Sequence, residues 1–321
     1  MKILVTGGAG FIGSNFVKRQ IRLNPMNVSK IVVLDKLTYA GNLNNFTTEE
    51  RDAFEFIHGD ICDVETVERL VKDSDQIVNF AAESHVDRSI SSGTNFVETN
   101  TLGTQVLLDA CRKLGVSKFL QVSTDEVYGS IDEGSWDENF PLMPNSPYSA
   151  SKASADLLVR AYGKTFGIHT NITRCSNNYG PYQFPEKVIP LFVTNLIQGK
   201  QVPIYGKGLN IRDWLHVNDH CRGIELVLQN GEKGEIYNIG GGTELKNIDL
   251  AKSILGSFGF GEEKINFVQD RLGHDNRYSV DITKISINLG YAPLTPFQDG
   301  LRSTIEFYKE NTTWWNSLVN N

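Results

Sequence analysis

The stretch Thr6–Gly13 reads Thr-Gly-Gly-Ala-Gly-Phe-Ile-Gly, directly after an apolar strand-like run and directly before a helical pattern. Glycine at such positions permits a tight turn, lets the backbone approach a pyrophosphate and packs the helix against the strand. The N–H groups and positive dipole at the start of that helix favour phosphate groups. The order of strand, glycine turn and helix therefore predicts a dinucleotide site, with contacts from Gly7, Gly10, Phe11, Ile12 and Gly13.

The sequence around this stretch alternates between strand-length apolar runs and amphipathic helical stretches. This alternation predicts an α/β fold of the Rossmann type, a doubly wound parallel sheet with helices on both faces. After Asn177 the prolines become frequent, which indicates a smaller, loop-rich substrate domain. The expected strands cover 2–6, 30–35, 54–58, 76–81, 118–123 and 169–175, and the expected helices include 63–72, 96–114 and 148–166. We expect a dinucleotide domain over 1–178 and a C-terminal domain over 179–321, with 211–240 returning to the first as a helix over 213–229 and a strand over 235–239.

Polar residues at the ends of the predicted strands indicate which cofactor binds. Asp35 ends the second strand 22 residues beyond Gly13, close to the distance of about 20 expected for a ribose-binding carboxylate. A carboxylate repels a 2′-phosphate, so Asp35 favours NAD over NADP, although Lys36 beside it weakens that preference. Asp60 and Ile61 follow the third strand and are candidates for adenine contacts, and Ala81 for the nicotinamide side.

Tyr148 and Lys152 stand four residues apart at the start of a predicted helix and share one of its faces. Ser146 suits the N-cap of this helix and Pro147 its first position. A nearby ammonium and the positive helix end favour the phenolate form of tyrosine. We therefore expect Tyr148 to act as a base that takes a proton from a hydroxyl during hydride transfer.

Thr124, Asp125 and Glu126 follow the fifth strand, so their side chains are expected at the same edge of the sheet. Hydride transfer needs only the tyrosine, the lysine and a hydroxyl such as that of Thr124. Two adjacent carboxyl groups push their pKa values apart, so one can stay protonated while the other is ionised. An acid and a base in one pocket suit the elimination of water.

Composition and charge limit the other possibilities. The 321 residues carry a net charge of −7 without a basic stripe, which argues against a nucleic-acid partner. No apolar run is long enough to cross a bilayer and the first residues lack the pattern of a signal peptide, so we expect a cytoplasmic protein without a membrane partner. The four cysteines are widely spaced, which predicts reduced thiols and no metal site.

Six motifs together resemble one family closely. TGGAGFIG, Thr124 and the Tyr148/Lys152 pair are similar to the extended short-chain dehydrogenases that act on nucleotide sugars. Within that group, STDEVYG at 123–129, AAESHVDRS at 81–89, RCSNNYGP at 174–181 and DRLGHDNRY at 270–278 resemble the dTDP-glucose 4,6-dehydratases. The similarity extends over nearly the whole chain.

The resemblance implies a lyase of deoxysugar biosynthesis, the chemistry that leads to dTDP-rhamnose. Tyr148, assisted by Lys152 and Thr124, deprotonates the C4 hydroxyl while hydride passes to NAD; Glu126 removes the C5 proton and Asp125 protonates the departing C6 hydroxyl. Hydride then returns to C6, which leaves dTDP-4-dehydro-6-deoxyglucose. The resemblance also implies a homodimer built from helices 100–114 and 148–166. The nucleotide-sugar contacts that it implies are Ser84, Thr124, Asn177, Lys187, Pro203, Tyr205, Arg212, Asn247, Arg271 and His274, with Asn177 also touching NAD.

Three alternatives stay open at this stage. A nucleotide-sugar 4-epimerase shares the fold, NAD and the Tyr148/Lys152 pair but needs no acid and base at 125–126. A 4,6-dehydratase for another nucleotide sugar would keep both carboxyl groups. A catalytically silent NAD-binding sensor would need none of these four side chains. Residues 41–53 and the last ten residues have no feature to which we assign a function.

Overall fold

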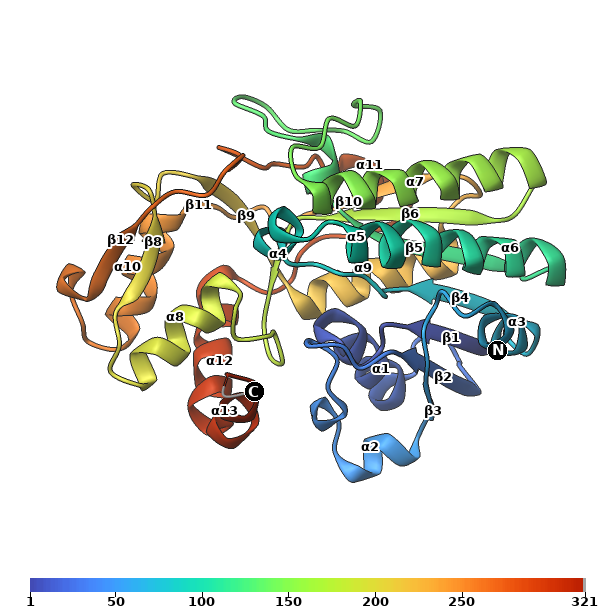
Figure 1. Ribbon diagram of the computed structural model, residues 1–321, viewed down its shortest axis with the longest axis horizontal. Coiled ribbons are helices and arrows are strands. Elements are labelled where there is room, and N and C mark those ends of the chain that lie inside the picture. Colours follow the sequence, from blue (N-terminus) through green and yellow to red (C-terminus); the bar gives the residue numbers. More distant parts are fainter. Residues whose placement is uncertain (320–321) are drawn as a thin grey trace.

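A seven-stranded parallel sheet runs through the larger part of the molecule (Figure 1). The computed structural model describes residues 1–319. The strands lie in the order β10-β6-β5-β4-β1-β2-β3. The chain adds β2 and β3 on one side of β1 and then adds β4 and the later strands on the other side, as in a doubly wound fold. The predicted Rossmann-type sheet is therefore confirmed. Its strands are β1 (Lys2–Thr6), β2 (Lys30–Asp35), β3 (Glu55–His58), β4 (Gln76–Asn79), β5 (Lys118–Thr124), β6 (Thr170–Cys175) and β10 (Ile236–Ile239).

Helices cover both faces of this sheet because the strands are apolar on both sides. Ile3 and Val5 of β1 point into one core, and Leu4 between them points into the other. Helices α1 (Phe11–Leu23) and α9 (Val217–Asn230) pack together on the first face. The other face carries α3 (Val64–Lys72), α6 (Thr104–Leu114) and α7 (Pro147–Phe166).

The second half of the chain builds a smaller lobe at the carboxyl edge of the sheet (Figure 1). A core of its own holds it together, with Phe192, Tyr308 and Trp315 almost completely buried. Two small sheets, in the orders β11-β9-β7 and β12-β8, belong to this part. Its elements are β7 (Asn177–Tyr179), α8 (Val188–Ile197), β8 (Val202–Tyr205), β9 (Ile211–His216), β11 (Glu244–Lys246), α10 (Asn247–Ser257), η4 (Glu262–Lys264), β12 (Ile265–Val268), α12 (Phe297–Glu310) and α13 (Thr312–Val319). Helix α11 (Thr283–Leu289) instead packs against β10 and α9 on the large sheet.

Short elements complete the connections near the cofactor edge. They are η1 (Leu43–Asn45), α2 (Thr48–Asp52), α4 (Val86–Ser91), α5 (Thr94–Phe96), the π-helical stretch η2 (Val97–Gly103) and η3 (Asp125–Tyr128). The helix expected over 96–114 is thus interrupted, since its first part is π-helical before α6 begins.

The chain returns to the large sheet later than predicted, at α9 and not at residue 211. The predicted helix over 213–229 is wrong at its start, because Ile211–His216 form β9, which pairs with β11 and β7 in the small lobe. The side chain of His216 accepts the N–H of Asn218 and caps α9, so the helix starts only at Val217. Helix α9 and β10 do join the large sheet, and β10 pairs with β6. The boundary expected at 178 falls inside β7.

Within residues 1–319, no helix is long and apolar enough to cross a lipid bilayer. The same part of the chain contains no cluster of histidine, cysteine or carboxylate side chains that could hold a metal ion.

Candidate active site

A cleft opens along the carboxyl ends of β1, β2, β4 and β5, and the small lobe closes its far side. It brings together the residues that the sequence suggested for cofactor binding and for catalysis. Those suggested for the cofactor are Gly7, Gly10, Phe11, Ile12, Gly13, Asp35, Lys36, Asp60, Ile61, Ala81 and Asn177, and those suggested for catalysis are Thr124, Asp125, Glu126, Tyr148 and Lys152.

The glycine turn leaves no room for side chains. Gly7 has a φ of +68°, and a Cβ there would lie 2.5 Å from the backbone nitrogen of Ala81. A Cβ on Gly13 would lie 2.3 Å from the carbonyl oxygen of Gly7, so this glycine lets α1 start against the strand. Helix α1 begins without a side-chain cap and without an acidic residue in its first turn. Its first N–H groups are therefore suited to the phosphates of a dinucleotide.

Asp35 is held rigidly at the end of β2. One carboxylate oxygen accepts the N–H of Ala9 at 2.9 Å and the other accepts the N–H of Leu37 at 2.8 Å. Burial raises the pKa of Asp35, and these two hydrogen bonds oppose that rise. The carboxylate is thus fixed beside the glycine turn, where the ribose of a dinucleotide lies in this type of fold.

Lys36 has a partner within the protein. Its ammonium lies 2.6 Å from a carboxylate oxygen of Asp60, and the other oxygen of Asp60 accepts the N–H of Cys62 at 2.9 Å. Both side chains line the cleft, so the positive charge of Lys36 is largely neutralised there. The ion pair with Asp60 leaves Lys36 with less positive charge to attract the 2′-phosphate of NADP, so Lys36 opposes the preference for NAD less than its position in the sequence indicated.

Tyr148 and Lys152 enter the cleft from the first turns of α7. The hydroxyl of Ser146 accepts the N–H of Ser149, and Pro147 occupies the first turn, as the sequence predicted. The ammonium of Lys152 donates to the carbonyl oxygen of Val122 at 2.7 Å. Both side chains are buried, which places them at the end of β5.

The lowered pKa that we expected for Tyr148 is wrong for this structure. Burial raises the pKa of its phenol well above the ordinary value, and the carboxyl group of Glu126 raises it further. A hydrogen bond with the hydroxyl of Thr124 opposes this rise only in part. The sequence argument counted the charge of Lys152 but not the two carboxyl groups opposite the phenol.

Asp125 and Glu126 differ in their surroundings. Burial, then the carboxyl groups of Glu126 and Asp213, raise the pKa of Asp125 well above its usual range. Burial also raises the pKa of Glu126, but the positive charges of Lys187, Arg212 and Arg271 oppose that rise. Asp125 is only 2% exposed, and one of its carboxylate oxygens lacks a hydrogen-bond partner among the described residues. The pair therefore offers a protonated acid and a neighbouring base.

Comparisons with known proteins agree with this chemistry. A family model described as GDP-mannose 4,6 dehydratase matches residues 4–304. A dTDP-glucose 4,6-dehydratase from Streptomyces niveus is 54% identical over 99% of this chain and 96% of its own length. The chain belongs to the dTDP-glucose 4,6-dehydratase family. The crystal structure of its family member DesIV from Streptomyces venezuelae, with NAD and dTDP bound, superposes with a TM-score of 0.97 at 54% identity, over 99% of this chain and 100% of that one. A UDP-glucose 4-epimerase from Thermotoga maritima shares the fold at a TM-score of 0.89 and 30% identity, over 97% and 100% of the two chains.

The residues that are expected to bind the substrate of this dehydratase family member fall into three groups, which lie in the cleft or close to Glu126, around the ring of Tyr205, and in the small lobe away from the cleft. Ser84, Asn177 and Lys187 line the cleft, and the ammonium of Lys187 donates to the carbonyl oxygen of Ser84 at 2.8 Å. Arg212 and Arg271 lie close enough to Glu126 to affect its pKa, although they come from the small lobe.

Tyr205 and His274 form the second group with Arg271. The Arg271 guanidinium lies 5.2 Å from the centre of the Tyr205 ring, and the His274 ring lies 6.1 Å from it. The third group, Pro203 on β8 and Asn247 at the start of α10, lies in the small lobe and does not line the cleft. Neither has a described contact with the acid and base.

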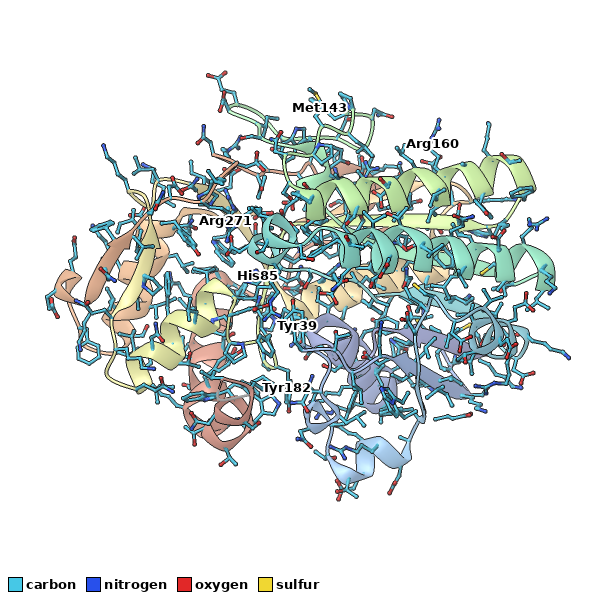
Figure 2. The ribbon with its side chains drawn as sticks, viewed as in Figure 1. Tyr39, His85, Met143, Arg160, Tyr182 and Arg271 are labelled. Carbon is cyan, nitrogen blue, oxygen red and sulfur yellow. The ribbon has the colours of Figure 1, made fainter. Side chains whose placement is uncertain are left out.

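The sequence analysis missed several residues at this site. Asp87 binds Arg271, with its two carboxylate oxygens 2.6 and 3.0 Å from the guanidinium nitrogens. Tyr39 and Glu186 also line the cleft. Figure 2 shows Arg271, His85 and Tyr39 in succession along the boundary between the small lobe and the large sheet. Asp87 lies in the motif AAESHVDRS, which could have drawn attention to it, whereas no pattern points to Tyr39.

Proposed function

We propose that this protein converts dTDP-glucose into dTDP-4-dehydro-6-deoxyglucose and water, with NAD as a cofactor that is regenerated in each cycle. The observation that carries the proposal is the acid and base, Asp125 and Glu126, in the same cleft as Tyr148, Lys152 and Thr124. An epimerase would have no use for these two carboxyl groups, and a silent sensor would need none of the five side chains.

The chain's residues fit NAD at the cleft. The glycine turn provides a side-chain-free approach to a pyrophosphate, and the fixed carboxylate of Asp35 favours a ribose without a 2′-phosphate. Asp60 and Ile61 would face the adenine, and Ala81 the nicotinamide side. Asn177 has a buried side-chain oxygen without a partner among the described residues, as expected for a group that binds a ligand. When bound, NAD accepts hydride from C4 of the sugar and later returns it to C6.

Tyr148 takes the proton of the C4 hydroxyl in the first step of the proposed reaction. The hydroxyl of Thr124 lies close enough to the phenol to lower its pKa, and we propose that it orients the phenol. The ammonium of Lys152, anchored on the carbonyl oxygen of Val122, provides positive charge beneath the developing phenolate. Because burial and the carboxyl groups raise the pKa of Tyr148, proton removal depends on this lysine and on the positive charge of the oxidised cofactor.

Glu126 and Asp125 carry out the elimination. The C4 ketone acidifies the C5 hydrogen, and Glu126 removes it as a proton. Asp125, which its surroundings keep protonated, gives its proton to the C6 hydroxyl so that water leaves. Glu126 then returns its proton to C5 when hydride reaches C6. The proton that Tyr148 took from the C4 hydroxyl must pass to Asp125 before the next cycle, which restores both side chains, so protons and electrons balance.

The substrate's nucleotide part requires cations outside the acid–base pair. Arg212 and Arg271 suit the two phosphates, because a guanidinium binds paired oxygens, and Lys187 adds a third charge. Ser84 and Asn177 line the cleft and are proposed to contact the sugar, while Tyr205 and His274 are proposed to contact the base. Pro203 and Asn247 are proposed as peripheral contacts of the base end.

The test of the overall reaction uses dTDP-glucose labelled with deuterium at C4, followed by mass spectrometry of the product. The proposal predicts the loss of one water and deuterium retained at C6. A product isomeric with the substrate would identify an epimerase. No conversion of dTDP-glucose, with conversion of another nucleotide sugar, would show that the base specificity is wrong.

Glu126→Gln tests the assignment of the C5 base. We expect oxidation at C4 to persist, visible as reduced nicotinamide absorbance on mixing with substrate, while water release falls by about 100-fold or more. Glu133→Gln is the matched control, because Glu133 is exposed in the loop after η3 and should release water at the normal rate. Normal water release by Glu126→Gln would remove Glu126 from this role.

We also propose a cytoplasmic homodimer. All four cysteines are free thiols, which suits a reducing compartment. Exposed apolar side chains project from η2 and α7, among them Val97, Leu102 and Leu157, and could be covered by a second copy. Sedimentation velocity of the Leu157→Glu variant tests the dimer.

A further inference from the structure

Two chain segments form a roof over the cofactor cleft. Residues 38–41 leave the end of β2, residues 183–187 follow β7, and members of both segments line the cleft. Tyr39 of the first segment and Phe184 of the second meet edge to face, with ring centres 5.4 Å apart and an interplanar angle of 85°. This ring contact closes the cleft between the two segments.

The first segment is anchored through residues 41–53, which we call the strap. The N–H of Asn42 and the side-chain amide of Asn45 both donate to the carbonyl oxygen of Ala9, at 3.0 and 2.9 Å. The N–H of Ala9 in turn donates to Asp35. Asn45 is buried, with 2% of its surface exposed. The strap is thus tied to the glycine turn and, through Ala9, to the ribose carboxylate.

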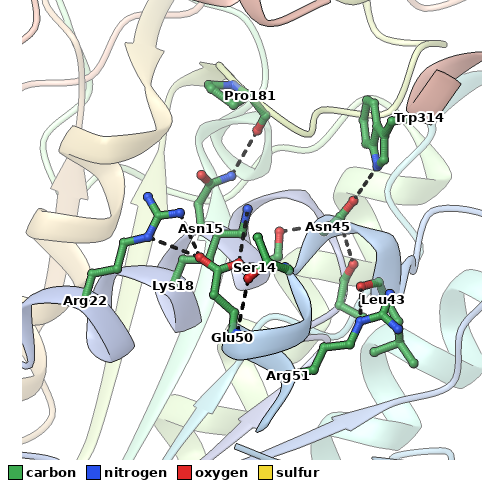
Figure 3. A network of polar contacts seen from close by, with 12 residues as sticks. Ser14, Asn15, Lys18, Arg22, Leu43, Asn45, Glu50, Arg51, Pro181 and Trp314 are labelled. Carbon is green, nitrogen blue, oxygen red and sulfur yellow. Dashed lines mark hydrogen bonds and ion pairs between the residues drawn. The ribbon is translucent and has the colours of Figure 1, made fainter. Parts of the chain in front are cut away.

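The strap is also held from the other lobe. The indole N–H of Trp314, on helix α13, donates to the side-chain oxygen of Asn45 at 3.0 Å (Figure 3). These two residues stand 269 positions apart in the sequence. One asparagine side chain therefore links the glycine turn to the last described helix of the chain.

The second roof segment reaches the same tryptophan. Tyr182, which precedes Gln183, packs edge to face on Trp314 with ring centres 5.6 Å apart. Tyr182 has a φ of +69°, a left-handed conformation that is unfavourable for a non-glycine residue and so needs support from its surroundings. That support includes the ammonium of Lys18, 3.4 Å from the ring centre, while Asn15 donates to the carbonyl oxygen of Pro181 at 3.0 Å.

We propose that Asn45 and Trp314 are positioning residues that keep this roof closed and thereby retain NAD between the two hydride transfers. The inference rests on the proposed function, because only a reaction that returns its electrons to the same sugar needs the reduced cofactor to stay. Neither residue lines the cleft, so their effect passes through Ala9, Tyr39, Tyr182 and Phe184. Residues 38–41 follow Asp35, which is proposed to bind the ribose, and line the cleft, so we expect this side of the roof to hold the adenosine half of NAD.

The experiment measures how fast NAD leaves the loaded protein without substrate, with an NAD-consuming enzyme as the trap for released cofactor. Trp314→Phe keeps a ring against Tyr182 but loses the indole N–H, and Asn45→Ala loses the same hydrogen bond together with the one to Ala9. We expect Trp314→Phe to release NAD about fivefold faster, the effect of one hydrogen bond, and Asn45→Ala to release it at least as fast as Trp314→Phe. The double variant should be no more than about twice as fast as the faster single variant, because the lost Asn45–Trp314 bond is shared.

Trp315→Phe is the matched control. Its indole N–H donates to the carbonyl oxygen of Tyr308, so the substitution loses a hydrogen bond within the C-terminal helices but none to the strap. Release at the normal rate from this variant, with faster release from the other two, supports the proposal. Equal acceleration in all three would mean that general loosening of α12 and α13 causes the effect, and unchanged release from Trp314→Phe would overturn the proposal.

A second measurement separates this inference from the proposed reaction. During turnover of dTDP-glucose, Trp314→Phe should lose activity progressively as reduced cofactor escapes, and added NAD should restore it. A general structural defect would leave the activity low after NAD is added, which the proposal does not predict. If the wild-type protein converts no dTDP-glucose, the proposed function fails, but the release rates still decide whether the roof retains NAD.

Discussion

Asp125 and Glu126 are neighbours in the chain, yet their surroundings give them different protonation behaviour. Asp125 faces further negative charge from Asp213, whereas three cations surround Glu126. The more strongly raised pKa of Asp125 suits this group to the proposed role of acid, and the cations near Glu126 suit that group to the role of base. The pKa values of Asp125 and Glu126 differ because charged side chains from the start of α8, from β9 and from the 270–278 segment lie near them. The difference can therefore be seen only in the folded chain.

The pH dependence of water elimination should report this difference. Asp125 must be protonated to act, so elimination should fall as the pH rises through its raised pKa, whereas Glu126 must be ionised, so elimination should also fall as the pH drops through the pKa of Glu126. Asp125→Asn should lower the elimination rate by about 100-fold. It should also remove the alkaline decline, which is measured from kcat against pH for both proteins. An unchanged alkaline limb in the variant would assign that limb to another group.

Sequence reasoning found the residues of the site that lie in short motifs and missed those that depend on long-range contacts. Thr124, Asp125 and Glu126 could be predicted because they directly follow a strand whose end must face the cleft. Tyr39 and Trp314 could not, because their importance depends on ring and hydrogen-bond partners distant in the sequence. The expected phenolate at Tyr148 failed for a similar reason: the helix spacing placed Lys152 nearby but said nothing about the opposing carboxyl groups.

At the scale of elements, the sequence predicted the large sheet well because most of its strands contain a short apolar run, although β6, which reads Thr-Asn-Ile-Thr-Arg-Cys, does not. The prediction of a helix over 213–229 is wrong at its start, where the chain forms β9. Asp213 and His216 break the alternation of apolar and polar residues that marks a half-buried strand. Asp213 can be buried in this strand because its carboxylate accepts the N–H groups of Gly241 and Thr243. No local sequence pattern reveals these contacts.

The N-terminus of α7 sets the position of the tyrosine that it carries. Ser146 and Ser149 form a reciprocal capping box, and Tyr148 lies between them. Ser146→Ala should lower the free energy of unfolding by about 1 kcal/mol, as the loss of an N-cap usually does. Denaturant titration measures this change, and kcat should also fall because the first turn frays where Tyr148 begins.

Ser154→Ala serves as the control for this helix. Ser154 lies in the exposed middle of α7, where its hydroxyl donates to the carbonyl oxygen of Ala150. Alanine is a better helix former there, so unfolding free energy and kcat should stay the same or rise slightly. Equal losses in the two variants would show that the cap has no special role in positioning Tyr148.

At the scale of the whole molecule, the proposed acid and base come from the large sheet, while the arginines proposed to bind phosphate come from the small lobe. Arg271 of the small lobe is held by Asp87 of α4, and this ion pair joins the two parts beside the cleft. A substrate that spans both parts therefore contacts the reacting groups and the lobe boundary at once. Domain boundaries read from sequence miss this arrangement, because β7 and β9 carry the chain into the small lobe on either side of α8.

The proposed homodimer places a second copy against η2, α6 and α7, which lie side by side on one face of the large sheet (Figure 1). Leu157 is 56% exposed in the single chain, so a dimer through this face would bury it. Leu157→Glu would then leave a charge in an apolar interface, at a cost of several kcal/mol, and should weaken dimerisation by about 100-fold or more. Sedimentation velocity measures this as a shift from about twice the chain mass of 35.8 kDa to the single mass.

Ile287→Glu provides the comparison for that shift. Ile287 is 77% exposed on α11, on a different helix from the proposed interface, so its substitution should leave the sedimentation of the dimer unchanged. A dimer that survives Leu157→Glu but dissociates with Ile287→Glu would place the interface on the α11 face instead. Because Tyr148 lies in the first turn of α7, a dimer through this helix also constrains the catalytic side chain, and the monomeric variant should lose part of its kcat together with its partner.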